Sequence, residues 1–253
     1  MRFASLGSGS RGNALVVESG GTRVLVDCGF GPRQLAVRLA RLGLAAADLD
    51  AVLITHEHSD HASGLAACAA RYRLPVFLTH GTLSGLTLRD GLTLRVIDSH
   101  APFAVGDLEV RPYPMPHDGR EPAQFVVADG RHRFGMLTDA GCVTPHMVAM
   151  LSGCDALLLE CNHDADMLAG GRYPVHLKRR IAGRLGHLDN TAAAGLLARL
   201  DRRRLQHVVA AHLSQENNTP DLARAALAGV LACQPEWIAV AEQEAGLAWR
   251  EIR

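Results

Sequence analysis

The sequence predicts an α/β protein that forms a four-layer αββα sandwich of two mixed sheets covered by helices. Strand-rich and helix-rich segments follow one another twice along the chain of 253 residues, and no linker rich in Pro, Gly or Ser separates the two halves. Each expected helix has a single apolar stripe, which must be buried against a sheet. Two sheets packed face to face, with helices outside, meet this requirement in a single domain of residues 1–253.

The first half begins as a meander of short strands and continues as a β-α-β unit. Gly20-Gly21 predicts a hairpin turn between two of these strands. Pro32 begins a run of leucines at helical spacing, and Gly43 ends it. The expected elements are strands at 3–6, 14–18 and 23–27, a helix from 32 to 42, a strand at 51–55, a helix over 61–72 and a strand at 75–78.

The second half repeats this order. Short apolar runs bounded by turn residues predict its strands, and apolar residues three and four positions apart predict its helices. The expected elements are strands at 108–113, 124–129 and 134–138, a helix near 145–151, a strand at 156–160, helices within 173–185 and 190–200, a strand at 207–211 and a helix over 220–231.

Composition and charge exclude several classes of protein. The 26 basic and 26 acidic residues cancel, and the sequence pI near 7.2 differs from that of a dedicated nucleic-acid-binding domain. At 48% apolar and 21% charged residues, the chain is not intrinsically disordered. No apolar run reaches the roughly 18 residues that span a bilayer, and residues 1–10 lack the pattern of a signal peptide. We therefore expect a cytoplasmic protein without a membrane partner.

A glycine-rich segment, Gly7-Ser8-Gly9-Ser10-Arg11-Gly12, matches the dinucleotide-binding pattern, with Asp27 at a suitable distance beyond it. That pattern must open a helix, whereas residues 13–17 are typical of a strand. We therefore interpret the segment as a turn whose backbone approaches an active site, with Ser10 and Asn13 as candidate substrate contacts. A tight turn without such a role is the alternative.

The strongest chemical signal is Thr55-His56-Glu57-His58-Ser59-Asp60-His61, at the end of an expected buried strand. In a compact turn, the first two histidines point one way and the Asp60-His61 pair another, so that one loop can serve two metal ions. A polar loop that happens to be rich in histidine is the alternative. Clustered imidazoles repel one another when they are protonated, however, whereas neutral imidazoles can bind one metal ion together.

This HxHxDH motif at a strand end resembles the metallo-β-lactamase-fold hydrolases, and the rest of the chain continues the resemblance in order. In that superfamily an Asp ends an earlier strand, as Asp27 does here. A lone His, an Asp and a last His follow the motif, and His117, Asp139 and His212 stand in these places. The resemblance implies the metallo-β-lactamase fold.

The same resemblance implies two divalent metal ions, Zn or Mn, and Fe is also compatible with His and Asp ligands. The implied ligands are His56, His58 and His117 for one ion, and Asp60, His61 and His212 for the other, with Asp139 shared. Asp27 would accept a hydrogen bond from a ligand imidazole and thereby fix its tautomer.

Within the superfamily, the chain is most similar to the YycJ/WalJ-like subgroup, over essentially its whole length. The segments that carry this likeness are 8–13, 159–164, 171–174, 177–180, 186–188 and 211–218. Members of the subgroup look like nucleases, so the resemblance implies a nucleic acid substrate, DNA rather than RNA. No β-CASP insertion is expected, because the predicted elements fill the segment between Asp139 and His212.

The metals imply a mechanism in which two ions lower the pKa of a bridging water and clamp a phosphodiester, with Asp60 among the catalytic residues. The segment from Glu160 to His212 also resembles the tRNase Z arrangement. His187 is then the candidate acid that protonates the leaving group, and Glu160 would orient it. The alternative for His187 is a helix-capping or surface histidine. The alternative for Glu160 is a buried residue that serves only as a pair partner. Asn162 and His163 are candidate phosphate contacts.

Arginines are frequent in the last third of the chain, at Arg179, Arg180, Arg184, Arg199, Arg202, Arg203 and Arg204. Guanidinium groups suit phosphate binding, although a solvated helix face is the alternative. Together with His187, they favour a dinuclear nuclease, an exonuclease or other phosphodiesterase acting on DNA.

Two other function classes stay open. A small-molecule hydrolase on the same site would be a cyclic phosphate esterase, a thioesterase, a lactonase or a weak β-lactamase. A non-catalytic metal-binding protein would lack one of the ligands, and none is missing from the sequence. The sequence gives no indication of an oligomeric state.

Overall fold

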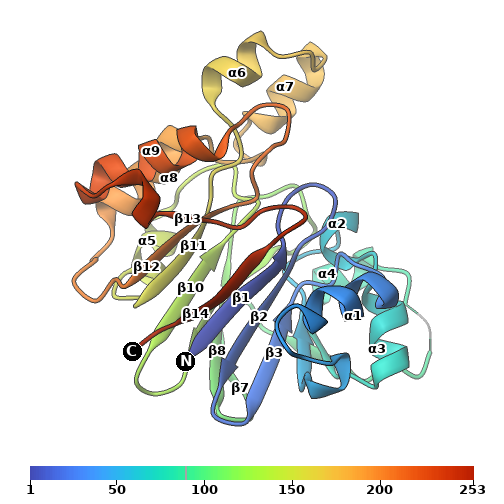
Figure 1. Ribbon diagram of the computed structural model, residues 1–253. Coiled ribbons are helices and arrows are strands. Elements are labelled where there is room, and N and C mark those ends of the chain that lie inside the picture. The colour runs from blue at the N-terminus through green and yellow to red at the C-terminus, as the bar shows by residue number, and fades with distance from the viewer. Residues whose placement is uncertain (89) are drawn as a thin grey trace.

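The computed structural model describes residues 1–88 and 90–253 of the chain. Within these residues, two mixed sheets of seven strands each pack face to face (Figure 1). In spatial order, the first sheet contains β14 (Leu247–Glu251), β1 (Arg2–Gly7), β2 (Ala14–Ser19), β3 (Thr22–Val26), β4 (Ala51–Leu53), β5 (Val76–Thr79) and β6 (Leu94–Ile97). The second contains β13 (Ala239–Val240), β12 (His207–Ala211), β11 (Ala156–Glu160), β10 (Arg133–Leu137), β9 (Ala123–Ala128), β8 (Leu108–Pro114) and β7 (Phe103–Val105).

Helices cover the outer face of each sheet, and apolar cores lie between the layers (Figure 1). The covering helices are α1 (Pro32–Ala40) and α3 (Leu65–Tyr72) on the first sheet, and α5 (Pro145–Leu151), α8 (Asn190–Arg199) and α9 (Pro220–Leu231) on the second. A middle core joins the two sheets, for example through Phe3 and Phe134, whose ring centroids lie 4.3 Å apart. The predicted αββα sandwich is therefore confirmed.

Most predicted elements begin and end close to the expected positions, but several short ones lie outside the prediction. These are the strands β6, β7, β13 and β14, the helices α4 (His80–Gly85) and α6 (Ala165–Gly170), and turns of 3-10 helix at Ala46–Asp48 and Pro235–Trp237. All four strands are the edge strands of their sheets. An edge strand is paired on one side only, and β6 buries none of its residues, so these strands lack the apolar runs that predict the central ones.

The prediction of one helix over 61–72 is wrong at its start, because the helical segment begins two residues earlier and is interrupted at residues 63 and 64. α2 (Ser59–Ala62) and α3 are separate helices in the structure. Between them, a Cβ atom on Gly64 would lie 1.9 Å from the carbonyl oxygen of Phe30, so glycine is required for this close approach. The interruption therefore comes from a tertiary contact, which helical spacing does not show.

The strand directions bring the predicted site residues to the same end of both sheets, where the carboxyl ends of the strands lie. β3, β4 and β5 run parallel to one another, and so do β10, β11 and β12. β8 shares the direction of β10, because both pair antiparallel with β9. In sheets of this kind, ligands bind beyond the carboxyl ends of the strands. The residues found at or after these ends are Asp27, residues 55–61, His117, Asp139, Glu160 and His212.

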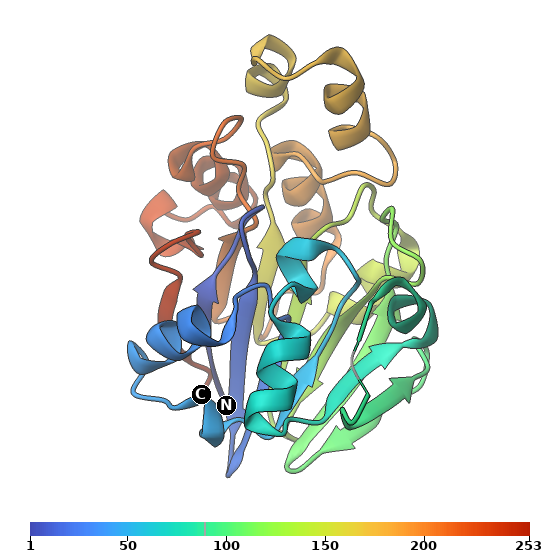
Figure 2. The ribbon, with the colours of Figure 1, turned by 90° about the vertical axis from the view of Figure 1, so that its right-hand side faces the viewer.

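A short helical arm, residues 164–186, stands off the sandwich at the same end (Figure 1, Figure 2). It contains α6 and α7 (Val175–Ile181), and α7 is the helix predicted within 173–185. The segment between Asp139 and His212 thus holds this small arm and no β-CASP insertion. Among the helices that the structure describes, none has the length and apolar character needed to cross a membrane.

Candidate metal centre

Three residues of the candidate site hold a left-handed backbone conformation. Asp27 has a φ of 61°, Asp139 of 58° and His212 of 55°. For a residue other than glycine, such a conformation costs about 1–3 kcal/mol and persists where the surroundings impose it. Each of the three lies within two residues of a strand end, at β3, β10 and β12. The chain therefore turns sharply at these points and directs the side chains toward a common centre.

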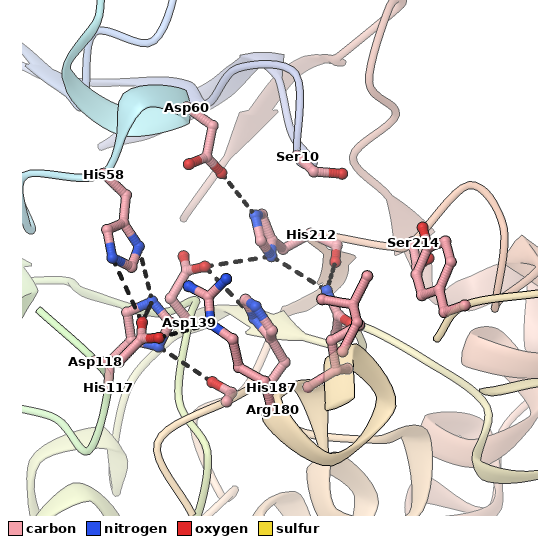
Figure 3. A pocket seen from close by; sticks show the side chains of 15 residues that line it. Ser10, His58, Asp60, His117, Asp118, Asp139, Arg180, His187, His212 and Ser214 are labelled. Carbon is pink, nitrogen blue, oxygen red and sulfur yellow. Dashed lines mark hydrogen bonds and ion pairs between the residues drawn. The ribbon is translucent and has the colours of Figure 1, made fainter. Parts of the chain in front are cut away.

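Three histidines form the first cluster of ligand-type atoms. His56, His58 and His117 each place a ring nitrogen within 4.8 Å of the others. His58 Nδ1 lies 3.2 Å from His117 Nε2 (Figure 3). Burial lowers the pKa of His56 well below its ordinary value, and it also lowers the pKa of His117. These two imidazoles are therefore neutral near pH 7, which is the form that binds a metal ion.

Two carboxylates and two histidines, Asp60, His61, Asp139 and His212, form a second cluster beside the first. His61 Nε2 lies 3.1 Å from Asp139 Oδ2 and 3.3 Å from Asp60 Oδ2. His212 Nε2 lies 3.4 Å from Asp60 Oδ2 (Figure 3). Burial raises the pKa of Asp139, but the charges of His212 and His61 outweigh burial and hold the pKa well below its ordinary value. The rings of His56 and His61 lie 4.2 Å apart, so the two clusters adjoin.

Unpaired buried atoms in both clusters fit a bound cation. Among the described residues, His56 Nε2 is buried without a hydrogen-bond partner, and Asp139 Oδ2 is buried without a hydrogen bond, with the ion-pair contact to His61 Nε2 beside it. A buried polar atom left unpaired costs about 1–3 kcal/mol, so a native fold needs a reason to keep it. A divalent metal ion accepts imidazole nitrogen and carboxylate oxygen as ligands and supplies the missing partner. The residues present therefore fit a divalent metal site.

Four of the five predicted ligand histidines have a partner on Nδ1, whereas His58 turns its Nδ1 toward His117 and its Nε2 toward Asp118. The Nδ1 contacts of the four join His56 to Thr55 Oγ1 (2.9 Å), His61 to Asp27 Oδ2 (2.7 Å), His117 to the Gly186 carbonyl (3.1 Å) and His212 to Glu160 Oε1 (3.3 Å). A partner on Nδ1 leaves Nε2 to face the centre, as is usual for metal-bound histidine. Thr55 and Gly186 were not predicted. Because Thr55 directly precedes His56, the sequence could have suggested that its hydroxyl contacts this histidine. The contact of the Gly186 carbonyl could not be predicted, because every residue has a backbone carbonyl.

We expect Asp27→Ala to weaken metal binding about 10- to 100-fold, the usual effect of removing the partner of a ligand histidine. Asp27 Oδ1 also accepts the Thr55 N–H at 2.9 Å, so the substitution loosens two residues of the motif loop. Competition with a coloured chelator measures the affinity. Asp221→Ala, at a side chain that is 95% exposed on α9, is the control and should bind metal normally. An unchanged affinity in Asp27→Ala would contradict this role.

His187 and Glu160 form a pair beside the second cluster. Glu160 Oε1 lies 2.8 Å from His187 Nδ1, and Glu160 Oε2 accepts the N–H groups of Ala140 and Leu188. Burial raises the pKa of Glu160, but His187 lowers it to about 2. Burial lowers the pKa of His187, and the charge of Glu160 outweighs burial and raises it above its ordinary value. His187 also lines the cavity in front of the clusters, so the imidazole with the raised pKa faces this cavity.

The four predicted substrate contacts do not all reach that cavity. Ser10 and Asn162 line it. Asn13 is buried, and its Nδ2 donates to Asp60 Oδ2 at 3.2 Å, so it ties the glycine-rich segment to the second cluster. His163 is also buried and lines a neighbouring cavity. The sequence indicated the chemistry of these side chains, but it did not indicate their directions.

The glycine-rich segment at 7–12 adjoins the site. Strand β2 follows it, so the dinucleotide pattern lacks the helix that it requires. Ser8 Oγ accepts the N–H of His212 at 2.9 Å, a contact that was not predicted. Gly9 and Gly12 have φ values of 141° and 147°, which glycine adopts readily. The segment therefore helps to fix a ligand loop.

A cavity of about 240 Å³ lies in front of the ligand clusters. Among the residues that line it are His58, Asp60, His117, Asp139 and His212 on the sandwich, and Tyr173, Leu177, Arg180 and Ile181 on the arm. Arg180 Nε lies 2.9 Å from Asp118 Oδ2, and Asp118 Oδ1 lies 3.4 Å from His58 Nε2 (Figure 3). Tyr173 and Asp118 were not predicted, because their role depends on the placement of the arm.

The arginines of the last third of the sequence have different surroundings in the structure. Arg180 lines the cavity at the metal centre, and Arg199 lines the neighbouring one. Arg203 pairs with Asp201 at 2.7 Å, and Arg204 pairs with Asp155 at 3.0 Å. Closeness in sequence therefore does not make these arginines one binding surface.

Two mixed sheets that carry His and Asp clusters on the loops after their strands define the metallo-β-lactamase fold. Residues 22–212 match the family model described as "Beta-lactamase superfamily domain". The chain belongs to this family and is an enzyme of the hydrolase superfamily, as the HxHxDH motif predicted.

Relatives that are similar in sequence indicate a subgroup within this family. The chain is 35% identical over 237 residues to "Exodeoxyribonuclease YycJ" of Bacillus anthracis, a match that covers 91% of this chain and 89% of the relative. It is 31% identical over 237 residues to "Exodeoxyribonuclease WalJ" of Streptococcus pneumoniae, covering 91% and 88%. The crystal structure of the metallo-β-lactamase fold protein YhfI from Bacillus subtilis superposes with a TM-score of 0.77 at 17% identity, over 98% of both chains. The predicted YycJ/WalJ-like resemblance is confirmed.

Proposed function

We propose that the chain is a dinuclear metal-dependent exonuclease that hydrolyses phosphodiester bonds of DNA. The observation that carries the proposal is the pair of adjoining ligand clusters, the second of which contains Asp139. Asp139 Oδ2 lies 3.1 Å from His61 Nε2, and the ring centroid of His61 lies 4.2 Å from that of His56 in the first cluster. One ion would be held by His56, His58 and His117 and the other by Asp60, His61 and His212, with Asp139 shared.

The side chains around the clusters suit phosphodiester hydrolysis. Divalent ions held here would lower the pKa of a water molecule and offset the charge of the phosphate. His187, kept protonated by Glu160, would give a proton to the departing oxygen. Ser10 and Asn162 would donate hydrogen bonds to the phosphate oxygens, since both line the cavity.

Nucleic acid as the substrate is supported by two independent observations. Both named relatives are exodeoxyribonucleases and match the chain over 237 residues. The arm beside the cavity carries Lys178, Arg179 and Arg180, which are opposite in charge to a phosphate chain.

Ligands from both sheets meet in one centre, and this supports residues 1–253 acting as a single domain.

We expect the purified protein to shorten linear DNA labelled at one end when Mn²⁺ or Zn²⁺ is present, and to lose this activity in EDTA. Duplex and single-stranded substrates show the polarity and the exonuclease mode, and an RNA strand of the same sequence tests the preference for DNA. Asp139→Ala, purified in parallel, controls for contaminating nuclease. Hydrolysis of a small phosphodiester or thioester, without shortening of DNA, would contradict the nuclease proposal.

A further inference from the structure

The arm, residues 164–186, is attached to the sandwich by little apolar burial. Leu168 is the one buried side chain among residues 164–185, and α7 contains no buried residue. Both ribbon views show α6 and α7 standing off the sheets (Figure 1, Figure 2). A segment with so few buried contacts gains little stability from packing, so core formation does not explain its position beside the cavity.

The side of the arm that faces the metal centre has a particular chemistry. Tyr173, Leu177 and Ile181 form an aromatic and aliphatic wall of the cavity. Arg180 reaches across to Asp118, yet its side chain remains 63% exposed. An ion pair that is open to solvent contributes little and is readily exchanged for another partner. The cavity thus has metal-ligand side chains on one side, and an apolar surface with an exchangeable guanidinium on the other.

The arm is also strongly basic in a chain whose net charge is zero. Residues 164–186 carry five basic residues, Arg172, Lys178, Arg179, Arg180 and Arg184, against two acidic ones, Asp164 and Asp166, and both acidic residues precede residue 167. A local positive charge of this kind attracts a phosphate backbone, whatever the charge of the whole protein.

We propose that the arm receives an unpaired terminal nucleotide of the nucleic acid, with its base stacked on Tyr173 and a phosphate bound by Arg180 in place of Asp118. This inference rests on the proposed nuclease function. A paired duplex presents phosphates and groove edges on its outside, whereas an aromatic and aliphatic wall matches the face of a base that is free of its partner. The substrate is then a single-stranded or frayed DNA end, and a blunt duplex must open before it enters.

Binding of cleavage-resistant DNA tests this directly. Two duplexes with phosphorothioate linkages differ only in their last two base pairs, which are matched in one and mismatched in the other. Fluorescence anisotropy with the Mn²⁺-loaded protein should show tighter binding of the mismatched end. Tyr173→Ala should weaken binding of that end by about 5- to 150-fold, the range for the loss of one stacked base, and Tyr173→Phe should restore it.

The arginine is tested in the same assay. Arg180→Ala should weaken binding of both duplexes and lower the slope of affinity against salt concentration by about one phosphate contact. Arg111→Ala, at an exposed arginine on β8 that pairs with Glu109 and lies outside the arm, is the matched control and should bind like the unaltered protein.

Equal binding of matched and mismatched ends, or an unchanged affinity in Tyr173→Ala, would overturn the inference. DNA digestion that proceeds normally in Tyr173→Ala would overturn it while leaving the nuclease function intact. Conversely, Tyr173-dependent binding without any metal-dependent digestion would contradict the nuclease function and retain the arm as a binding site for an unpaired nucleotide.

Discussion

Replacing Asp139 with alanine is expected to lower the rate of phosphodiester hydrolysis by more than about 10²-fold, since loss of even an indirect partner of a metal ligand costs about 10- to 100-fold. Asp139 is 2% exposed, and its Oδ2 lies 3.1 Å from His61 Nε2. It is the predicted ligand shared by both ions, so its loss should lower the metal content as well as the rate. Activity on labelled DNA and metal content per chain measure the two effects.

Asp139→Asn is the matched variant for this test. Asn keeps the shape of the side chain and tolerates the left-handed backbone that Asp139 adopts, with a φ of 58°. It removes the charge, so we expect it to lose most of the activity while remaining folded by circular dichroism. Full activity of Asp139→Asn would contradict the role of a charged shared ligand.

Replacing His187 with alanine is expected to slow DNA hydrolysis by about 10²- to 10⁴-fold, the usual contribution of a general acid, while the metal stays bound. The reason is that a DNA alkoxide leaves poorly without a proton. A substrate that releases 4-nitrophenolate needs no proton, so the variant should hydrolyse it at nearly the unaltered rate. Steady-state rates on the two substrates, with metal content measured in parallel, give the comparison.

The alternative role for His187 is that of a metal ligand. Asp139, Glu160, His187 and His212 place ligand-type atoms within 4.8 Å of one another, so the geometry permits it. In that case, His187→Ala would lose metal and would slow on both substrates equally, and the assignment as acid would be wrong.

A pH profile separates the two roles further. The charge of Glu160 raises the pKa of His187 above its ordinary value, so the acid form persists to a higher pH than in an ordinary histidine and is lost as the pH rises through this pKa. The rate on DNA should therefore fall on the alkaline side. In His187→Ala this alkaline fall should disappear, because the group that titrates is absent.

The residues of the candidate site could be predicted where they form a recognisable cluster in the sequence. Residues 55–61 place the predicted ligands His56, His58, Asp60 and His61 in one turn, so these residues could be recognised directly. His117, Asp139 and His212 stand alone, and only their order after successive strands distinguishes them. The directions of Asn13 and His163 could not be predicted, since both depend on how the loops pack against one another.

The fold could be predicted where the burial of an element is complete. All residues of β11 are buried, and its apolar run indicated a strand. The edge strands could not be predicted, because they are half exposed, as β6 shows. The position of the arm also could not be predicted, since α7 has no buried face that would show which surface it approaches.

Anomalous diffraction from crystals grown with Zn²⁺ tests the central claim most directly, which is that two divalent ions are bound side by side in the two adjoining clusters. We predict two anomalous peaks at the zinc absorption edge, one bounded by His56, His58 and His117 and the other by Asp60, His61 and His212, with Asp139 in contact with both. A single peak, or a second peak that is coordinated by Glu160 and His187 instead, would contradict the account.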